Sequence, residues 1–233
     1  MGWFSELPVT MVRIVVLRMR RFLARRGVMI VGYRQGSRIQ RLTMIERVRD
    51  HRALELTACD ASQLVAAVMA ARKIPGALAE VGVAYGASAR LITDTCPGKV
   101  LHLFDTFSGL PMPKDCDSAK FKSGQYACSL ESVQKYLGTR AVVFHKGLFP
   151  VETGKDVSQE RFSFVHLDGD LYQSTIDSLG FFYPRMSPGG MLLSHDYLTS
   201  DGVTRAFSEF FADKPEAVLE LIGHQCLVVK CTP

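Results

Sequence analysis

The chain has 233 residues, 47% of them hydrophobic, which suffices for a substantial core and excludes a disordered or low-complexity protein. Its formal net charge of +5 is unevenly distributed. Residues 1–52 hold 12 of the 28 basic residues, all arginine, and only three acids, so a basic front end precedes a mildly acidic remainder. The arginines do not alternate with aromatic residues that could stack on bases, so nucleic acid is not an expected partner.

Residues 10–26 carry apolar side chains at helical spacing, with arginines on the opposite face, which predicts an amphipathic helix. Two interpretations stay open. The apolar face packs on protein, either its own domain or a second subunit of a homo-oligomer, or the helix binds a membrane surface through its arginines. Because arginines interrupt every apolar run, neither a signal peptide nor a membrane span is expected. Residues 27–36 predict a hinge or a short strand.

The six cysteines form no CxxC pair and show no zinc-like spacing. In a chain of this length they are typical of reduced thiols, which indicates a cytoplasmic protein. Membrane association is the alternative that the basic helix leaves open. Cys116 and Cys128 flank a loop, and a disulfide between them is a further alternative.

Two helices are expected over residues 41–56 and 60–74, the second capped by Asp60 or Ser62. Beyond them, short apolar runs alternate with helical stretches, which predicts a doubly wound α/β fold with a mainly parallel sheet and helices on both faces. The expected strands are residues 77–83, 99–105, 141–147, 162–168 and 190–196, with helices around 87–95, 129–138, 172–186 and 202–213. A C-terminal antiparallel hairpin should close one edge of the sheet.

The predicted organisation is therefore a basic N-terminal helical arm with a lead-in helix over residues 1–58, followed by one α/β domain over residues 59–233. In open α/β sheets, ligands bind beyond the carboxyl ends of the strands, near the point where the strand order reverses. Candidate functional residues are accordingly sought at the strand ends.

The first predicted strand ends in EVGVAYGAS, where Glu80, Gly82 and Gly86 precede a helix and let a ligand approach the backbone. The second ends at Asp105, in a position to accept both ribose hydroxyls of an adenosine-containing cofactor. The middle glycine of the dinucleotide fingerprint is missing. This absence favours S-adenosylmethionine over a nicotinamide dinucleotide.

Two later strands also end in ionisable residues. FVHLDGDLYQST (164–175) contains Asp168 and Asp170, and LLSHDY (192–197) contains His195 and Asp196. If Asp168 and Asp170 share a pocket, their repulsion requires a cation or a shared proton. For Asp170 the alternative is a cap on the helix that follows, and for His195 it is a packed core histidine.

Six motifs occur in one order: EVGVAYGAS (80–88), FDTFSGLP (104–111), KGLFPVET (146–153), HLDGDLYQST (166–175), YPRMSPGG (183–190) and HDY (195–197). Together they resemble the macrocin O-methyltransferase (TylF) family over about residues 40–230. LTMIERVR (42–49) is also similar to the lead-in helix of that family.

This resemblance implies a Rossmann-like class I methyltransferase fold for the α/β domain. It also implies methyl transfer from S-adenosylmethionine to a sugar hydroxyl of a glycosylated natural product, glycolipid or polysaccharide. The cofactor-binding residues expected from it are Glu80, Gly82, Gly86, Ser88, Asp105 and Thr106. Many members are magnesium-dependent, and the match makes Asp168, His195 and Asp196 the expected metal ligands, with Asp168 and His195 as the catalytic residues.

His195 departs from the family pattern, which has a pair of aspartates where this chain has His195 and Asp196. Magnesium prefers oxygen ligands, so three interpretations stay open. The site binds a softer ion such as manganese; it holds magnesium through Asp168, Asp170 and Asp196; or it uses no metal, and His195 is the general base.

Two other functions remain as alternatives. A nicotinamide-dependent oxidoreductase is disfavoured by the missing glycine and by the lack of a Tyr-x-x-x-Lys base. A catalytically weakened protein that binds a partner or a membrane surface is kept open by His195. Residues 108–128 have the length and polarity of a lid over the substrate, or of a solvated surface loop. His102 and His166 are expected to be core residues.

Overall fold

The computed structural model describes residues 18–19, 22–23 and 36–231. The chain divides into two units, residues 1–40 and 41–233, and each is described by itself. None of the described helices is both long enough and apolar enough to cross a bilayer.

The predicted arginine helix over residues 10–26 lies mostly outside the described residues, and the four of its residues that are described are helical. Of the predicted hinge over residues 27–36, only Gly36 is described, at the start of helix α2 (Gly36–His51). The domain boundary expected at residue 58 stays a prediction.

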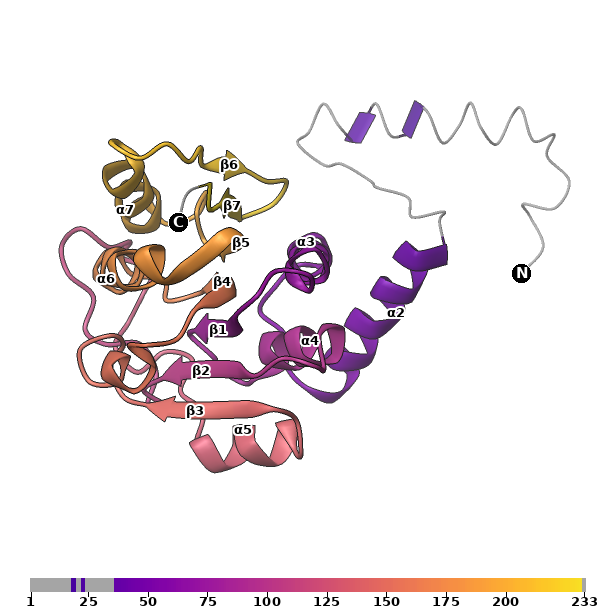
Figure 1. The fold of residues 1–233 in the computed structure, drawn as a ribbon. Coiled ribbons are helices and arrows are strands. Elements are labelled where there is room, and N and C mark those ends of the chain that lie inside the picture. The colour runs from indigo at the N-terminus through magenta and orange to yellow at the C-terminus, as the bar shows by residue number, and fades with distance from the viewer. Residues whose placement is uncertain (1–17, 20–21, 24–35, 232–233) are drawn as a thin grey trace, which may run out of the picture. The chain divides into compact units, whose positions relative to one another are not determined.

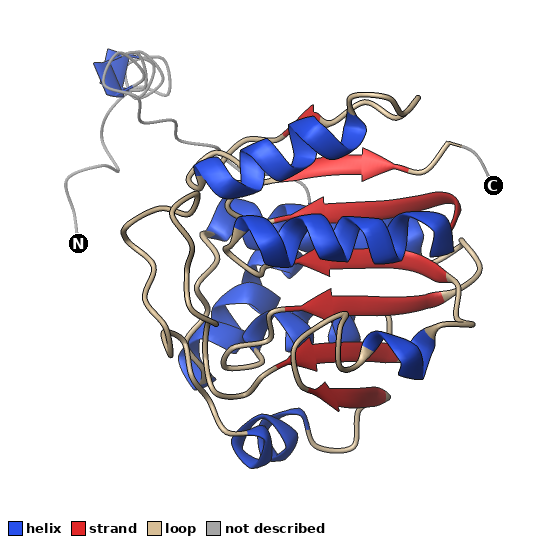
Figure 2. Cartoon of the chain, turned by 90° about the vertical axis from the view of Figure 1, so that its left-hand side faces the viewer, coloured by secondary structure: helices blue, strands red, loops and turns tan. Residues whose placement is uncertain are grey.

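Seven strands form one sheet in the order β3-β2-β1-β4-β5-β7-β6 (Figure 1). Neighbours from β3 to β5 pair in parallel, whereas β7 runs antiparallel to both β5 and β6 (Figure 2). The strands are β1 (Ala77–Val81), β2 (Leu101–Asp105), β3 (Val142–Lys146), β4 (Phe162–Leu167), β5 (Met186–Ser194), β6 (Leu219–Glu220) and β7 (Cys226–Val229). The predicted doubly wound sheet with a C-terminal antiparallel hairpin is confirmed.

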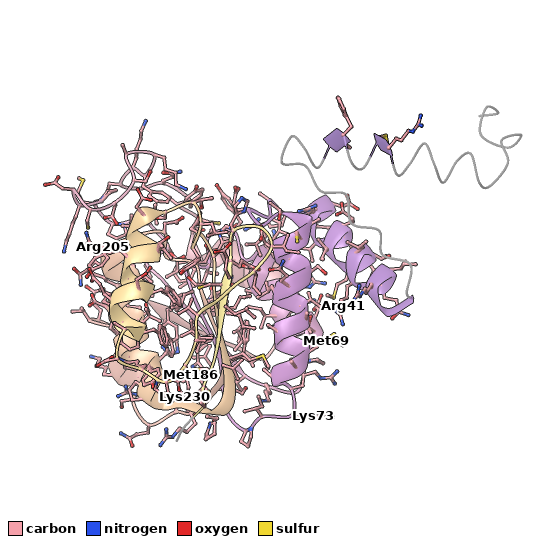
Figure 3. The ribbon with its side chains drawn as sticks, turned by 90° about the horizontal axis from the view of Figure 1, so that it is seen from above. Arg41, Met69, Lys73, Met186, Arg205 and Lys230 are labelled. Atoms are coloured by element: carbon pink, nitrogen blue, oxygen red, sulfur yellow. The ribbon has the colours of Figure 1, made fainter. Side chains whose placement is uncertain are left out.

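Helices cover both faces of the sheet (Figures 1 and 2). The helices of the second unit, besides α2, are α3 (Ala58–Ala71), α4 (Ala87–Thr95), α5 (Leu130–Leu137), α6 (Tyr172–Phe182) and α7 (Asp201–Phe211), with short 3-10 turns η1 (Gly154–Val157) and η2 (Tyr183–Arg185). Met69 on α3 and Arg205 on α7 lie on opposite sides of the sheet (Figure 3).

Side chains alternate along the strands and supply two separate cores. Leu78 and Phe164 pack with α2, α3, α4 and α5, whereas Ala79 and Val165, their neighbours in sequence, pack with α6 and α7. The second core is rich in aromatic rings: the ring centroid of Phe182 lies 4.9 Å from that of Phe149 and 5.0 Å from that of Phe162. Burial of both strand faces explains why these strands read as continuous apolar runs.

The predicted N-cap of α3 and the predicted start of β5 are wrong. The N-cap of α3 is Thr57, whose hydroxyl accepts a hydrogen bond from the Asp60 amide, so neither Asp60 nor Ser62 is the cap. Strand β5 begins four residues before the predicted start. The early start follows from Met186 pairing with Phe162 before a register shift in the β4–β5 ladder.

Candidate active site

A cavity of about 400 Å³ lies beyond the carboxyl ends of β1, β2, β4 and β5. Its walls come from the turns after these strands, from residues 53–57 before α3, from the loop after β2 and from the tip of the β6–β7 hairpin. Its volume is in the range of small-molecule binding sites, and its position is the one expected for an open α/β sheet.

The turn after β1 passes directly against the turn after β4. Gly82 has φ +85°, and a Cβ atom there would lie 2.0 Å from the carbonyl oxygen of Asp168. Gly82 lines the cavity, but this close backbone approach is itself sufficient to require glycine. Gly86, the N-cap of α4, does not line the cavity, and a Cβ there would lie 2.8 Å from Val133 Cγ1.

Asp105 holds two turns together at the end of β2. Its Oδ2 accepts hydrogen bonds from the amides of Val83 and Ala84 at 2.7 and 3.1 Å, and its Oδ1 accepts one from Phe107 at 2.7 Å. Asp105 also lines the cavity, together with Ser88 and Thr106 of the predicted cofactor set. These backbone donors fix the carboxylate at the edge of the cavity.

Glu80, in contrast, does not line the cavity. It is fully buried in β1, and its Oε1 lies 2.9 Å from Nδ1 of His166, its cross-strand partner in β4. Burial raises the pKa of Glu80, and His166 opposes that rise. The structure therefore places Glu80 and Gly86 outside the cavity wall and the other four predicted cofactor residues in it.

The structure brings Asp168, His195 and Asp196 together, although Asp168 lies 27 residues before His195. Nδ1 of His195 is 3.0 Å from Oδ1 of Asp168 and 3.1 Å from Oδ2 of Asp196. Burial alone would lower the pKa of His195, but the two carboxylates raise it to about 11. The two aspartates thus stabilise a proton on Nδ1 of His195.

Asp170 belongs to the same cluster and is also buried. Its burial raises its pKa well above the usual range, and the charges of Asp168 and Asp196 raise it further. Asp170 does not cap the following helix, as one interpretation held. The amide of Tyr172 at the start of α6 instead donates to Oδ1 of Asp117, at 2.7 Å.

Asp170 and Asp196 both have positive φ angles, 59° and 56°. Aspartate tolerates the left-handed region better than most residues. These two conformations turn the chain sharply at the ends of β4 and β5 and accompany the clustering of the acidic side chains at the cavity. Backbone strain of this kind is often found at functional sites.

The loop over residues 108–128 supplies much of one wall, including Lys120, Phe121 and Tyr126. Nζ of Lys120 lies 3.6 Å from Oδ1 of Asp196, so a positive charge from the loop faces the acidic cluster. Burial raises the pKa of Tyr126, as do the nearby charges of Asp170 and Asp196. The loop forms part of the cavity, as the lid interpretation requires.

Several wall residues escaped sequence reasoning. Residues 53–57 carry no motif and were expected to be partly helical. His224 occupies the tip of a hairpin and reaches the cavity only because β7 pairs with β5. No local pattern could identify these residues, because their positions depend on the tertiary fold.

The strand order and the strand-end cavity define a class I methyltransferase fold. The solved structure of the O-methyltransferase NovP has this fold, with a TM-score of 0.61 and 24% identity over 81% of this chain and 79% of that one. The chain belongs to the macrocin-O-methyltransferase (TylF) family, whose model matches residues 42–227. Both the fold class and the family expected from the motifs are confirmed.

Two curated relatives are each 31% identical to this chain. One, 8-demethyl-8-(2,3-dimethoxy-alpha-L-rhamnosyl)-tetracenomycin-C 4'-O-methyltransferase of Streptomyces olivaceus, matches over 166 residues, 63% of this chain and 62% of its own length. The other, mycinamicin III 3''-O-methyltransferase of Micromonospora griseorubida, matches over 143 residues, 53% and 56%. The chain therefore spans less than two thirds of either relative.

Proposed function

We propose that this protein is an S-adenosylmethionine-dependent O-methyltransferase that methylates a sugar hydroxyl of a glycosylated natural product. Membership of the TylF family and the names of both curated relatives support this proposal. The observation that carries it is a single cavity with Asp105 on one wall and the cluster of Asp168, Asp170 and Asp196 on another.

The cavity suits the cofactor. The carboxylate of Asp105 is held at the edge by three backbone amides, in the position where an acidic residue accepts ribose hydroxyls. Thr106 and Ser88 add hydroxyl groups to the same wall. Bound there, S-adenosylmethionine supplies an electrophilic methyl group for in-line transfer.

The acidic cluster suits a hard divalent cation. Asp168, Asp170 and Asp196 offer carboxylate oxygens, the ligands that magnesium prefers, and their mutual repulsion favours a cation between them. Nδ1 of His195 is already engaged by Asp168 and Asp196, which favours the all-oxygen interpretation over direct ligation through that atom. A divalent ion bound there would lower the pKa of the acceptor hydroxyl.

The proton of the acceptor hydroxyl must be removed as the methyl group transfers. We assign this step to Asp168, whose side chain is 20% exposed, compared with 13% for Asp196. The hydrogen bond from Nδ1 of His195 holds the Asp168 carboxylate in one orientation. In the metal-free alternative, His195 itself accepts the proton.

The first test is cofactor binding by calorimetry. S-adenosylmethionine and S-adenosylhomocysteine should each bind at micromolar strength, and Asp105→Asn should weaken both by about 10- to 100-fold, because a charged acceptor is lost. Asp168→Asn should leave cofactor binding unchanged but lower kcat by about 10²- to 10⁴-fold. Failure of both cofactors to bind would overturn the proposal, and tight binding of NAD instead would favour the oxidoreductase alternative.

The acceptor is tested with a panel of glycosides, including macrolide and polyketide glycosides, glycolipids and polysaccharides. If only a glycolipid is methylated, the acceptor of this protein belongs to a different class from the acceptors named for the two curated relatives. Cofactor binding without turnover on any acceptor would favour the weakened binding protein. Loss of activity in EDTA and its recovery with magnesium would support the all-oxygen cation site, whereas unchanged activity in EDTA would favour His195 as the base.

A further inference from the structure

The second ring nitrogen of His195 faces away from the acidic cluster. Nε2 is buried, has no hydrogen-bond partner among the described residues, and lies 4.0 Å from Oδ2 of Asp60. The His195 residue as a whole is only 9% exposed. A buried polar atom of this kind calls for a ligand, because most such atoms in proteins have a partner.

The environment of the ring matches that of a metal-binding histidine. Such residues usually donate one ring N–H to a carboxylate and bind the metal through the other nitrogen. Nδ1 of His195 lies within hydrogen-bond distance of Asp168 and Asp196, both acceptors, so this nitrogen is assigned the proton. Nε2 is then the nitrogen with a free lone pair.

Asp60 and His224 complete a three-residue group around that nitrogen. Asp60 is fully buried, and its Oδ2 lies 3.1 Å from Nδ1 of His224. One ligand atom from each of Asp60, His195 and His224 lies within 4.8 Å of the others. The ring centroids of the two histidines are 5.9 Å apart in an edge-to-face arrangement.

Hydrogen bonds and a glycine at the hairpin tip hold Asp60 and His224 next to each other. Oδ1 of Asp60 accepts the amide of His224 at 3.1 Å, and the Thr57 hydroxyl donates to Oδ2 of Asp60 at 2.5 Å. The preceding residue, Gly223, has φ +101°, and a Cβ there would lie 2.3 Å from Oδ1 of Asp60. The hairpin tip can therefore reach α3 only because residue 223 is glycine.

We propose that Asp60, His195 and His224 form a site for a divalent transition-metal ion, separate from the oxygen cluster of Asp168, Asp170 and Asp196. One carboxylate and two imidazoles suit zinc, manganese, cobalt or nickel and are poor ligands for magnesium. His195 and His224 also line the cavity, so the ion would have a coordination position open to it. This site explains why residue 195 is a histidine next to an acidic cluster.

Cobalt is the probe of choice because its visible absorption reports the ligands directly. The 233-residue protein, stripped with a chelator and then dialysed into excess Mg²⁺ to fill the oxygen cluster, should bind about one Co²⁺ with the absorption of a nitrogen- and oxygen-ligated ion. Calorimetry with Zn²⁺ should give the same stoichiometry. An excess of Mg²⁺ should not displace the bound Co²⁺.

His224→Ala should weaken Co²⁺ binding by about 100-fold or more. Loss of a residue that only hydrogen-bonds a metal ligand weakens binding by about 10- to 100-fold, and loss of the ligand itself should weaken it more. His224 is 39% exposed at a hairpin tip, so its removal should leave the fold intact, which circular dichroism checks. His51→Ala, at an exposed histidine on α2, is the matched control and should leave binding unchanged.

His224→Cys keeps a ligand at the same position and should add a thiolate charge-transfer band to the cobalt spectrum that the wild-type protein lacks. Wild-type affinity for Co²⁺ in a folded His224→Ala protein would overturn the proposal. Displacement of Co²⁺ by Mg²⁺ would overturn it as well, because it would place the ion in the oxygen cluster.

Discussion

Gly82 and Asp105 show how single residues shape the cavity. Gly82 lets the turn after β1 pass against the carbonyl group of Asp168, and Asp105 ties that turn to the end of β2 through backbone amides. Neither function needs a bound ligand. Both residues therefore contribute to the fold as well as to the proposed cofactor site, and their substitutions must be judged on stability as well as on binding.

At Gly82, substitution by alanine should lower the free energy of unfolding by about 3 kcal/mol or more, since a left-handed φ and a severe clash coincide. Gly180→Ala is the matched control. Gly180 lies exposed within α6, and a Cβ there meets no atom within 4 Å, so this change should stabilise the protein by about 1 kcal/mol. Urea denaturation of both variants measures the difference. Equal stability of the two would contradict the backbone contact.

Asp117 and Lys120 are among the residues that attach the loop over residues 108–128 to the rest of the domain. Asp117 accepts the first amide of α6, which has no side-chain cap of its own, and Lys120 donates to the carbonyl oxygen of Thr199 at 3.2 Å and pairs with Asp196. The first contact serves the helix, and the second places charge at the cavity. The loop is thus an integral part of the site.

Asp117→Ala should destabilise the protein by about 1 kcal/mol, the usual effect of losing a helix cap. It should also speed tryptic cleavage at Lys120 and Lys122, because the loop loses one of its attachments to α6. The measurements are thermal denaturation and limited proteolysis. Asp115→Ala, at an exposed position of the same loop, should change neither; a similar effect from it would show that the cap is unimportant.

Strands β2 and β3 carry a pair of buried histidines. Nδ1 of His102 lies 3.0 Å from Nε2 of His145, whose Nδ1 is 3.3 Å from Oδ2 of Asp156. Burial lowers the pKa of His102, the neighbouring His145 lowers it further, and Glu160 opposes the shift. His102 therefore resists protonation in the folded protein more than in the unfolded chain.

A depressed histidine pKa contributes stability above the unfolded value of about 6.5, and that contribution is lost as the pH falls toward the folded value. The free energy of unfolding should therefore fall with pH below about 6.5, and less steeply in His102→Asn. Denaturant titrations at a series of pH values measure both slopes. His51→Asn, at an exposed histidine, should keep the wild-type slope. Parallel slopes in the wild-type and His102→Asn proteins would refute the assignment.

The sequence allowed the doubly wound sheet and the edge at which the cavity lies to be predicted, because parallel strands end at one edge of a sheet. That rule brought Asp168 and His195 together correctly from positions 27 residues apart. It could not reveal that Glu80 pairs with His166, since this contact depends on strand register. Asp60 and His224 were also beyond it, because a helix turn and a hairpin tip meet only in the finished fold.

At the scale of the whole molecule, the basic N-terminal segment lies mostly outside the described residues, and its binding partner is a prediction from the sequence. We expect its apolar face to pack on its own domain or on a second subunit, with binding to an anionic membrane through its arginines as the alternative. Under the membrane alternative, replacing Arg20, Arg21, Arg25 and Arg26 with glutamine should weaken binding to phosphatidylserine vesicles by roughly 100-fold or more, at ~1 kcal/mol per arginine.

Vesicle sedimentation measures that binding, and cofactor affinity, which should not change, is the control. Unchanged sedimentation would exclude the membrane interpretation. A change in sedimentation equilibrium of the free protein would instead support subunit association.

The contact between Asp60 and His224 joins positions 164 residues apart beside the cavity. During synthesis, residues 53–57 leave the ribosome well before the β6–β7 hairpin, yet both are needed to enclose the same space. A nascent chain that stops before the hairpin has a sheet ending at β5 and a cavity with one wall missing. Ligand capture at this site therefore has to wait until the β6–β7 hairpin has been synthesised.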